Sequence, residues 1–247
     1  MAMDRRVALI VSANDYVGPE LAKVLAARQF DLVLADGSSE LVVELETAGA
    51  SVATIHNASA HDADTGPRLV DAALTRFGTF HSVFFSSGRI ALGRFAKTTA
   101  DDLRAAYEGN VEAPYVFTQA ILPTLLAQAD GQILVATSAT AYKPTVSASL
   151  YAATRSAATV MLQSVGLEIA DSGVQLNVVG TNFMDFPGFI AGNRIVTPED
   201  RKRVEARVPM KRLGTMTEFA HFCAVMLDGT SRFQTGQFIP YAGGWAT

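Results

Sequence analysis

A serine, a tyrosine and an arginine in the second half of the chain have residue types and a spacing suited to acid–base chemistry. Ser138 ends an apolar run, Tyr151 follows thirteen positions later, and Arg155 follows Tyr151 by four. Side chains four residues apart on a helix share one face, so Tyr151 and Arg155 can meet. The permanent charge of the arginine favours phenolate, which makes a base able to take a proton from an alcohol near neutral pH. The Ser138 hydroxyl could hold the alcohol oxygen meanwhile.

A parallel sheet is the expected support for these residues. Short apolar runs alternate with longer amphipathic stretches, which is typical of βαβ units with helices on both faces of the sheet. The expected strands are 7–11, 32–35, 52–55, 82–85, 132–136, 174–179 and 237–240, and the expected helices are 18–28, 39–48, 67–77, 100–126, 149–171 and 217–227. We therefore predict one Rossmann-like, doubly wound α/β domain over residues 1–247, with a seven-stranded parallel sheet flanked by helices.

Ligands of such a sheet bind at the carboxyl ends of its strands, so the loops there should carry the site. Residues 183–200 stand apart because they are rich in Phe, Gly, Pro and Asn and have little periodicity. This pattern predicts a long loop or lid, and loops of that length in compact domains are usually functional.

The composition excludes several classes of function. The chain is 49% apolar and 18% charged with a net charge of −4, which favours a large core and leaves no basic footprint for nucleic acid. The single cysteine, Cys223, forms no internal disulfide, and the four histidines lack metal-ligand spacing. No apolar run approaches the roughly 20 residues that span a bilayer. We expect a soluble cytoplasmic protein without a metal.

The first predicted turn does not look like a dinucleotide site. Such a turn needs several glycines so that the backbone can approach a pyrophosphate, but residues 11–19 retain only Gly18. Tyr16 should project a phenol into the phosphate path, although an ordinary turn capped by Asn14 or Asp15 would also explain the sequence. Asp36, at the end of the second strand, favours a dinucleotide site instead, because an acid there can hold an adenosine ribose.

Together these residues resemble the halohydrin dehalogenases, relatives of the short-chain dehydrogenases/reductases. The similarity rests on the order Ser138, Tyr151, Arg155 and on an aromatic residue followed by Gly18 in the first turn. It extends over nearly the whole chain and includes residues 180–183, 209–214 and 243–247. The sequence departs from the family pattern at Val11, where members have threonine, and at Thr181, where some have proline.

The resemblance implies cofactor-independent conversion of vicinal haloalcohols to epoxides, with halide release. Tyr151, activated by Arg155, would deprotonate the hydroxyl held by Ser138, and azide, cyanide or nitrite would open the epoxide in reverse. The implied halide or nucleophile site contains Tyr16, Thr181, Asn182, Phe183 and Met184. The weaker substrate-side candidates are Phe84, Phe85, Tyr142 and Phe189. By the same resemblance we expect a homotetramer.

Two alternatives remain. Asp36 and Asn110, which stands where reductases have a catalytic asparagine, are compatible with an atypical NAD(P)-dependent short-chain reductase. A degenerate, non-enzymatic regulator that senses a small ligand is the other alternative, although the intact Ser138, Tyr151 and Arg155 argue against it.

Overall fold

The computed structural model describes residues 5–246; Met1 to Asp4 and Thr247, at the ends of ranges used above, lie outside the described residues. A parallel sheet of seven strands runs through it in the order β3-β2-β1-β4-β5-β6-β7. The strands are β1 Arg6–Ile10, β2 Phe30–Ala35, β3 Val52–Ile55, β4 Ser82–Ser86, β5 Gly131–Ser138, β6 Val174–Thr181 and β7 Phe238–Tyr241. The predicted fold class is confirmed.

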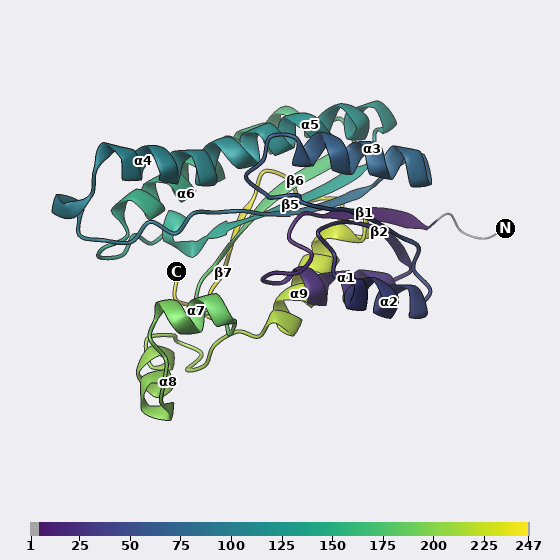
Figure 1. The fold of residues 1–247 in the computed structure, drawn as a ribbon. Coiled ribbons are helices and arrows are strands. Elements are labelled where there is room, and N and C mark those ends of the chain that lie inside the picture. Colours follow the sequence, from purple (N-terminus) through teal and green to yellow (C-terminus); the bar gives the residue numbers. More distant parts are fainter. Residues whose placement is uncertain (1–4, 247) are drawn as a thin grey trace.

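Helices cover both faces of the sheet (Figure 1). One face carries α3 Thr65–Phe77, α4 Ala100–Tyr107, α5 Ala113–Gln128 and α6 Ser149–Glu168, and the other carries α1 Gly18–Ala27, α2 Ser39–Thr47 and α9 Met216–Leu227. Each face has its own apolar core. Leu69, Phe117 and Leu162 belong to the first core, and Leu21 and Phe219 to the second. Burial on both faces explains why the strands read as continuous apolar runs.

The helix expected over residues 100–126 is interrupted. A short 3₁₀ turn, Phe95–Lys97, precedes α4, and a π-helical turn, Glu108–Glu112, separates α4 from α5. Pro114 lies in the first turn of α5, directly after the π turn. Single π turns are frequent at functional sites, and this one presents the buried Asn110.

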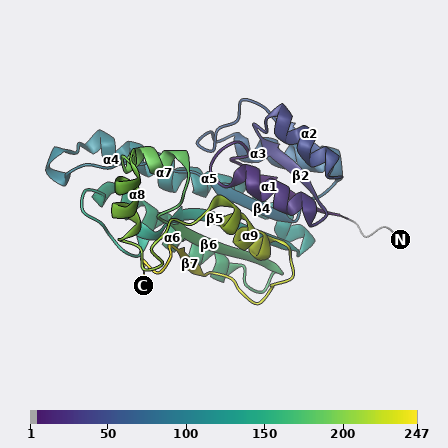
Figure 2. The same ribbon diagram turned by 90° about the horizontal axis from the view of Figure 1, so that it is seen from below.

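The segment expected as a long loop contains two short helices instead. These are α7 Pro187–Gly192 and α8 Pro198–Glu205, and α8 begins with a capping box between Thr197 and Asp200. Figures 1 and 2 place both helices at the end of the molecule near the described C-terminus, beyond the carboxyl ends of the strands. Phe183 and Trp245 share the small apolar cluster that holds this lobe.

No helix among residues 5–246 combines the length and the apolar character needed to cross a membrane.

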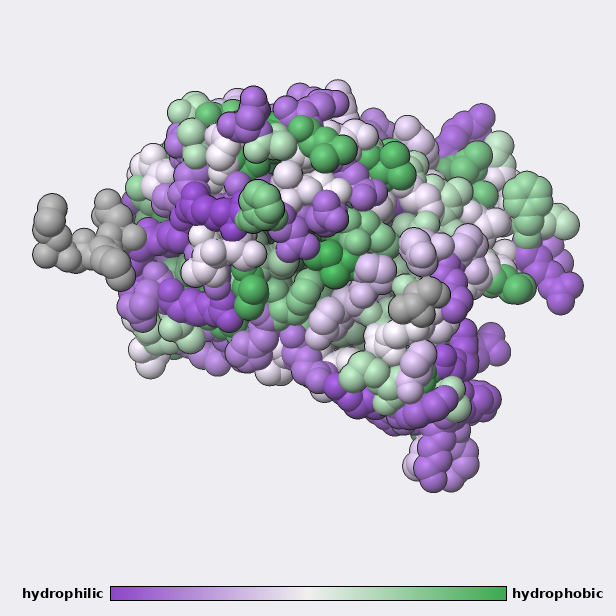
Figure 3. Space-filling view, turned by 180° about the vertical axis from the view of Figure 1, so that it is seen from behind, coloured by the Kyte–Doolittle hydropathy of each residue, from purple (hydrophilic) through white to green (hydrophobic). Residues whose placement is uncertain are grey.

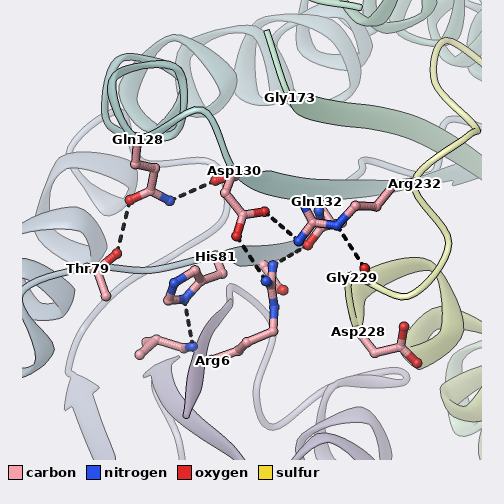
Figure 4. Close-up of polar contacts among 12 residues, drawn as sticks. Arg6, Thr79, His81, Gln128, Asp130, Gln132, Gly173, Asp228, Gly229 and Arg232 are labelled. Carbon is pink, nitrogen blue, oxygen red and sulfur yellow. Dashed lines mark hydrogen bonds and ion pairs between the residues drawn. The ribbon is translucent and has the colours of Figure 1, made fainter. Parts of the chain in front are cut away.

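A polar network closes the opposite edge of the sheet, away from these loops. Asp130 accepts from Arg6 and pairs with Arg232, at 3.0 Å in each case (Figure 4). Burial raises the pKa of Asp130, but the hydrogen bond from Arg6 and the charges of both arginines outweigh it, so the pKa lies below its ordinary value. An ion pair between Arg28, which follows α1, and Asp228, which follows α9, joins the ends of these two helices near this edge.

Replacing Asp130 with asparagine should therefore destabilise the protein in a pH-dependent way. A carboxyl whose folded-state pKa is lowered adds stability above its unfolded pKa of about 3.9, and this stability is lost as the pH falls through the folded value. We expect Asp130→Asn to lower the free energy of unfolding by about 1 kcal/mol at neutral pH and by less near pH 3. Urea unfolding at both pH values measures this, with the exposed Asp101→Asn as control; equal losses at both would contradict it.

Candidate active site

A cavity of about 500 Å³ lies at the carboxyl ends of the strands and under α7. It is lined by nine of the twelve candidate residues, which come from five separate stretches of chain: Tyr16, Ser138, Tyr151, Arg155, Thr181, Asn182, Phe183, Met184 and Phe189. The other three do not line it. Phe84 and Phe85 alternate into the two cores from β4, and Tyr142 is 61% exposed outside the cavity.

Ser138 ends β5 with its hydroxyl at the cavity wall. Its Oγ accepts from the Thr140 backbone N at 3.2 Å and from the Thr140 hydroxyl at 2.9 Å. Its own hydrogen has only a long contact of 3.5 Å, to the Thr181 carbonyl. The serine is therefore fixed by two donors and keeps a hydrogen for a substrate oxygen.

Tyr151 and Arg155 lie on the first turns of α6, as their spacing predicts. The guanidinium carbon is 5.4 Å from the centre of the Tyr151 ring, which is cation–π distance. Arg155 is only 5% exposed, and it donates to the Ser87 carbonyl. Gly88 makes this possible, because a Cβ there would come within 1.7 Å of the guanidinium. The arginine is thus a buried, fixed cation behind the tyrosine.

Asn110 braces the same helix from the π turn. Its amide donates to the Thr154 hydroxyl at 3.0 Å and to the Arg89 carbonyl at 2.9 Å, and its carbonyl accepts from the Arg89 N–H at 2.9 Å. Thr154 precedes Arg155 on α6, so the asparagine connects the loop after β4 to the helix that carries the tyrosine.

Tyr16 spans the cavity from the first turn to the end of β6. Its hydroxyl donates to the Thr181 Oγ1 at 2.6 Å, and its ring meets Phe186 edge-on at 4.9 Å. Burial raises the pKa of Tyr16 far above its ordinary value, so the phenol is neutral and acts as a donor. The tyrosine therefore joins the β1–α1 turn, the β6 end and the N-cap of α7.

The first turn, as it is folded, does not fit a dinucleotide pyrophosphate. Asp15 Oδ1 accepts from the Tyr16 backbone N–H at 2.7 Å, which occupies a donor that a phosphate would need and adds a negative charge. Neither Asn14 nor Asp15 caps α1, whose N-cap is Val17 without a side-chain bond. Gly18 keeps one glycine role, because a Cβ there would lie 1.7 Å from the Ser12 carbonyl.

The corner where an adenosine would lie keeps one feature of a nucleotide site. Asp36 follows β2 and holds the Ala58 backbone N–H at 2.8 Å through Oδ2. Asn14 bonds to the Asp36 carbonyl and accepts from the Ser38 N–H at 2.9 Å. One carboxylate oxygen of Asp36 therefore has no bond among the described residues, as a ribose hydroxyl would require.

Several cavity residues were missed from the sequence. Arg207 and Asn193 come from the α7–α8 lobe, and His61 comes from the loop after β3. None has a sequence signal, because each reaches the cavity through tertiary folding. Nowhere in residues 5–246 do three or more His, Cys, Asp or Glu side chains gather as metal ligands.

Comparison with known proteins identifies consistent relatives. The sequence profile of the family described as enoyl-(acyl carrier protein) reductase matches residues 12–246. The chain is 26% identical over 245 residues to 2,5-dichloro-2,5-cyclohexadiene-1,4-diol dehydrogenase LinX of Sphingobium indicum, covering 98% of this chain and 96% of the relative. It is 28% identical to oxidoreductase UcpA of Escherichia coli, over 94% and 90% of the two chains.

Solved structures show the same fold. The match to an actinorhodin polyketide ketoreductase with NADPH has a TM-score of 0.90 at 23% identity and covers 100% of both chains. Levodione reductase gives 0.87 at 23% identity, over 98% and 97%.

These relatives overturn one expectation. The profile is that of a reductase family, and the curated relatives are dehydrogenases and oxidoreductases. The expected cofactor-independent lyase that dehalogenates haloalcohols is therefore wrong. The residues that suggested it are present, but Ser138 and Tyr151 suit any reaction that begins by moving an alcohol proton.

Proposed function

This chain belongs to the short-chain dehydrogenase/reductase family, and we propose that it interconverts an alcohol and a carbonyl compound with a nicotinamide dinucleotide as hydride carrier. The observation that carries the proposal is the convergence of Ser138 and Tyr151 on one cavity, with the Arg155 cation fixed behind the tyrosine. The dehydrogenases among the relatives support an oxidation–reduction reaction.

The proton half of the reaction follows from the site. In oxidation, Ser138 donates its free hydrogen to the substrate oxygen, and Tyr151 takes the hydroxyl proton as the carbonyl forms. Arg155 lies as a fixed, buried cation 5.4 Å from the centre of the Tyr151 ring. A nicotinamide dinucleotide held with its adenosine ribose at Asp36 would supply the hydride acceptor, so that alcohol and oxidised nicotinamide would give carbonyl, reduced nicotinamide and a proton. In reduction Tyr151 returns the proton.

Asp36 sets an expected preference between the two nucleotides. An acid at the end of the second strand can bond the ribose 2′-hydroxyl, whereas it repels a 2′-phosphate. We expect weak binding of NADH that is still at least about tenfold tighter than binding of NADPH, and Asp36→Ser should reduce the difference. Fluorescence titration of both nucleotides measures this.

The proposal as a whole has a sharper test. Wild-type protein and Tyr16→Gly, which opens the first turn, should be assayed with NADH and a panel of ketones, and with NAD⁺ and the matching alcohols. Turnover that depends on Tyr151 supports the proposal. If neither protein binds either nucleotide, the proposal fails.

We also propose a homotetramer. Exposed apolar side chains on α4, α5 and α6 would form part of its interfaces: Leu103, Tyr107, Tyr115, Val160 and Leu167. Hydrophobic patches also interrupt the hydrophilic surface in Figure 3. Light scattering that gives a monomer at micromolar concentration would contradict this proposal.

A further inference from the structure

Four side chains that line the cavity can carry charge: Asp15, His61, Arg155 and Arg207. Asp15 is engaged with the first turn, and Arg155 is buried against the Ser87 carbonyl. Arg207 differs, because it is exposed and its guanidinium has neither a hydrogen bond nor an ion pair within residues 5–246. Of the two described arginines that line the cavity, Arg207 is therefore the one whose guanidinium is free to meet a ligand.

Two other arginines of this lobe are paired with nearby acids. Arg201 pairs with Asp185 and Glu205, and Arg203 pairs with Asp200. Asp185, Asp200 and Glu205 are therefore already in use, and the lobe is strongly hydrophilic at its outer tip (Figure 3, lower right). Arg207 has no carboxylate partner among the described residues and lines the cavity, which Arg194 does not, so its guanidinium is available for a ligand there.

Arg207 is also held in position. Its guanidinium carbon lies 5.1 Å from the centre of the Phe183 ring. Phe183 is itself buried between Phe189, at 5.7 Å, and Trp245, at 5.4 Å. Phe183 and Phe189 form an apolar wall along the cavity, so the cation stands at the end of an aromatic surface. This arrangement suits a molecule with an apolar body and a terminal negative charge.

We propose that Arg207 binds a carboxylate of the substrate, so that the chain acts on oxo acids or hydroxy acids with an apolar body. This inference rests on the proposed oxidoreductase function only for the reaction at the carbonyl or hydroxyl group; the binding of the carboxylate by Arg207 does not depend on it. Ser138 and Tyr151 hold the reacting oxygen, the apolar body lies along Phe183 and Phe189, and the carboxylate meets Arg207. The guanidinium fork matches the two oxygens of a carboxylate.

A matched pair of ligands tests the proposal by binding. The probes are 4-oxo-4-phenylbutanoate and its methyl ester, which differ in the charge at one end. Calorimetric titration should show the acid binding about tenfold more tightly than the ester, as a charge-assisted hydrogen bond predicts. Arg207→Gln should remove this preference. Arg203→Gln, which changes a paired arginine on the neighbouring helix α8, should keep it, and added salt should weaken it.

The outcomes separate this inference from the proposed function. A preference for the acid that survives Arg207→Gln, or that wild-type protein lacks, overturns the role of Arg207. If the acid binds through Arg207 but neither wild-type protein nor Tyr16→Gly reduces it with NADH, the carboxylate-binding role of Arg207 stands and the oxidoreductase proposal fails. If both ketones are reduced equally well and bind equally, the proposal for Arg207 fails alone.

Discussion

Replacing Tyr151 with phenylalanine is expected to lower kcat by two to four orders of magnitude, about 10²- to 10⁴-fold, in both directions of the reaction. The change removes one oxygen atom and leaves the ring over which Arg155 lies, at 5.4 Å. Packing of α6 should therefore persist, and only the proton transfer is lost. Initial rates with saturating substrate measure kcat, and calorimetry with the same ligand measures binding.

Two controls make this result specific. Tyr142→Phe removes the same atom from a tyrosine that is 61% exposed outside the cavity, and it should leave kcat within about twofold of wild type. The melting temperature of Tyr151→Phe should match that of wild type within a few degrees, since no hydrogen bond from its hydroxyl within residues 5–246 is lost. A Tyr151→Phe enzyme that keeps most of its activity would remove Tyr151 from the mechanism.

Much of the fold could be predicted from the sequence. Each strand was located to within a few residues because a strand buried on both faces must be apolar throughout. The break after Tyr107 was not predicted, although Gly109, Asn110 and Pro114 are poor helix formers that could have indicated it. Helix α7 was missed as well, because it is short and its segment is held by Phe183 and Trp245 rather than by its own periodicity, whereas Glu199 and Asp200 after Pro198 did indicate the start of α8.

The site was predictable where spacing along one element decides the geometry. Tyr151 and Arg155 meet because four residues make one helical turn. Phe84 and Phe85 were misplaced as substrate contacts: successive side chains of a strand point to opposite faces, and because helices cover both faces each ring lies in a core. Arg207 lies two residues beyond α8 and reaches the cavity through tertiary folding, which the capping residues at the start of that helix do not reveal.

The function was harder to predict for a chemical reason. A tyrosine base, a serine donor and a nearby cation deprotonate an alcohol in the same way whatever happens next. The difference between reactions lies in what leaves the substrate, and that depends on the region around Tyr16. Tyr16 in place of a glycine indicates that the path of a pyrophosphate is obstructed. It does not indicate which reaction the protein performs when the tyrosine ring moves.

Tyr16→Gly should tighten NADH binding by about tenfold or more. Three features of Tyr16 oppose the nucleotide in the present fold: the ring against Phe186, the bond to Thr181 and the backbone N–H held by Asp15. Glycine removes the first two. It also suits the backbone, because Tyr16 has a φ of 54°, a conformation that costs a side-chain-bearing residue energy and costs glycine little. Fluorescence titration of NADH measures the gain.

Tyr16→Phe separates the ring from the hydroxyl. It keeps the contact with Phe186 and loses only the 2.6 Å bond to Thr181, so NADH affinity should stay near that of wild type. An equal gain in both variants would make the hydroxyl, and not the ring, the obstacle. No gain in Tyr16→Gly would place the obstacle in the Asp15 carboxylate, which Asp15→Ser then tests, because serine keeps the turn polar and removes the charge that a pyrophosphate meets. A dinucleotide excluded even from the Tyr16→Gly, Asp15→Ser double variant would mean that this turn, with Ser12 and Asn14 beside it, cannot accept a pyrophosphate at all.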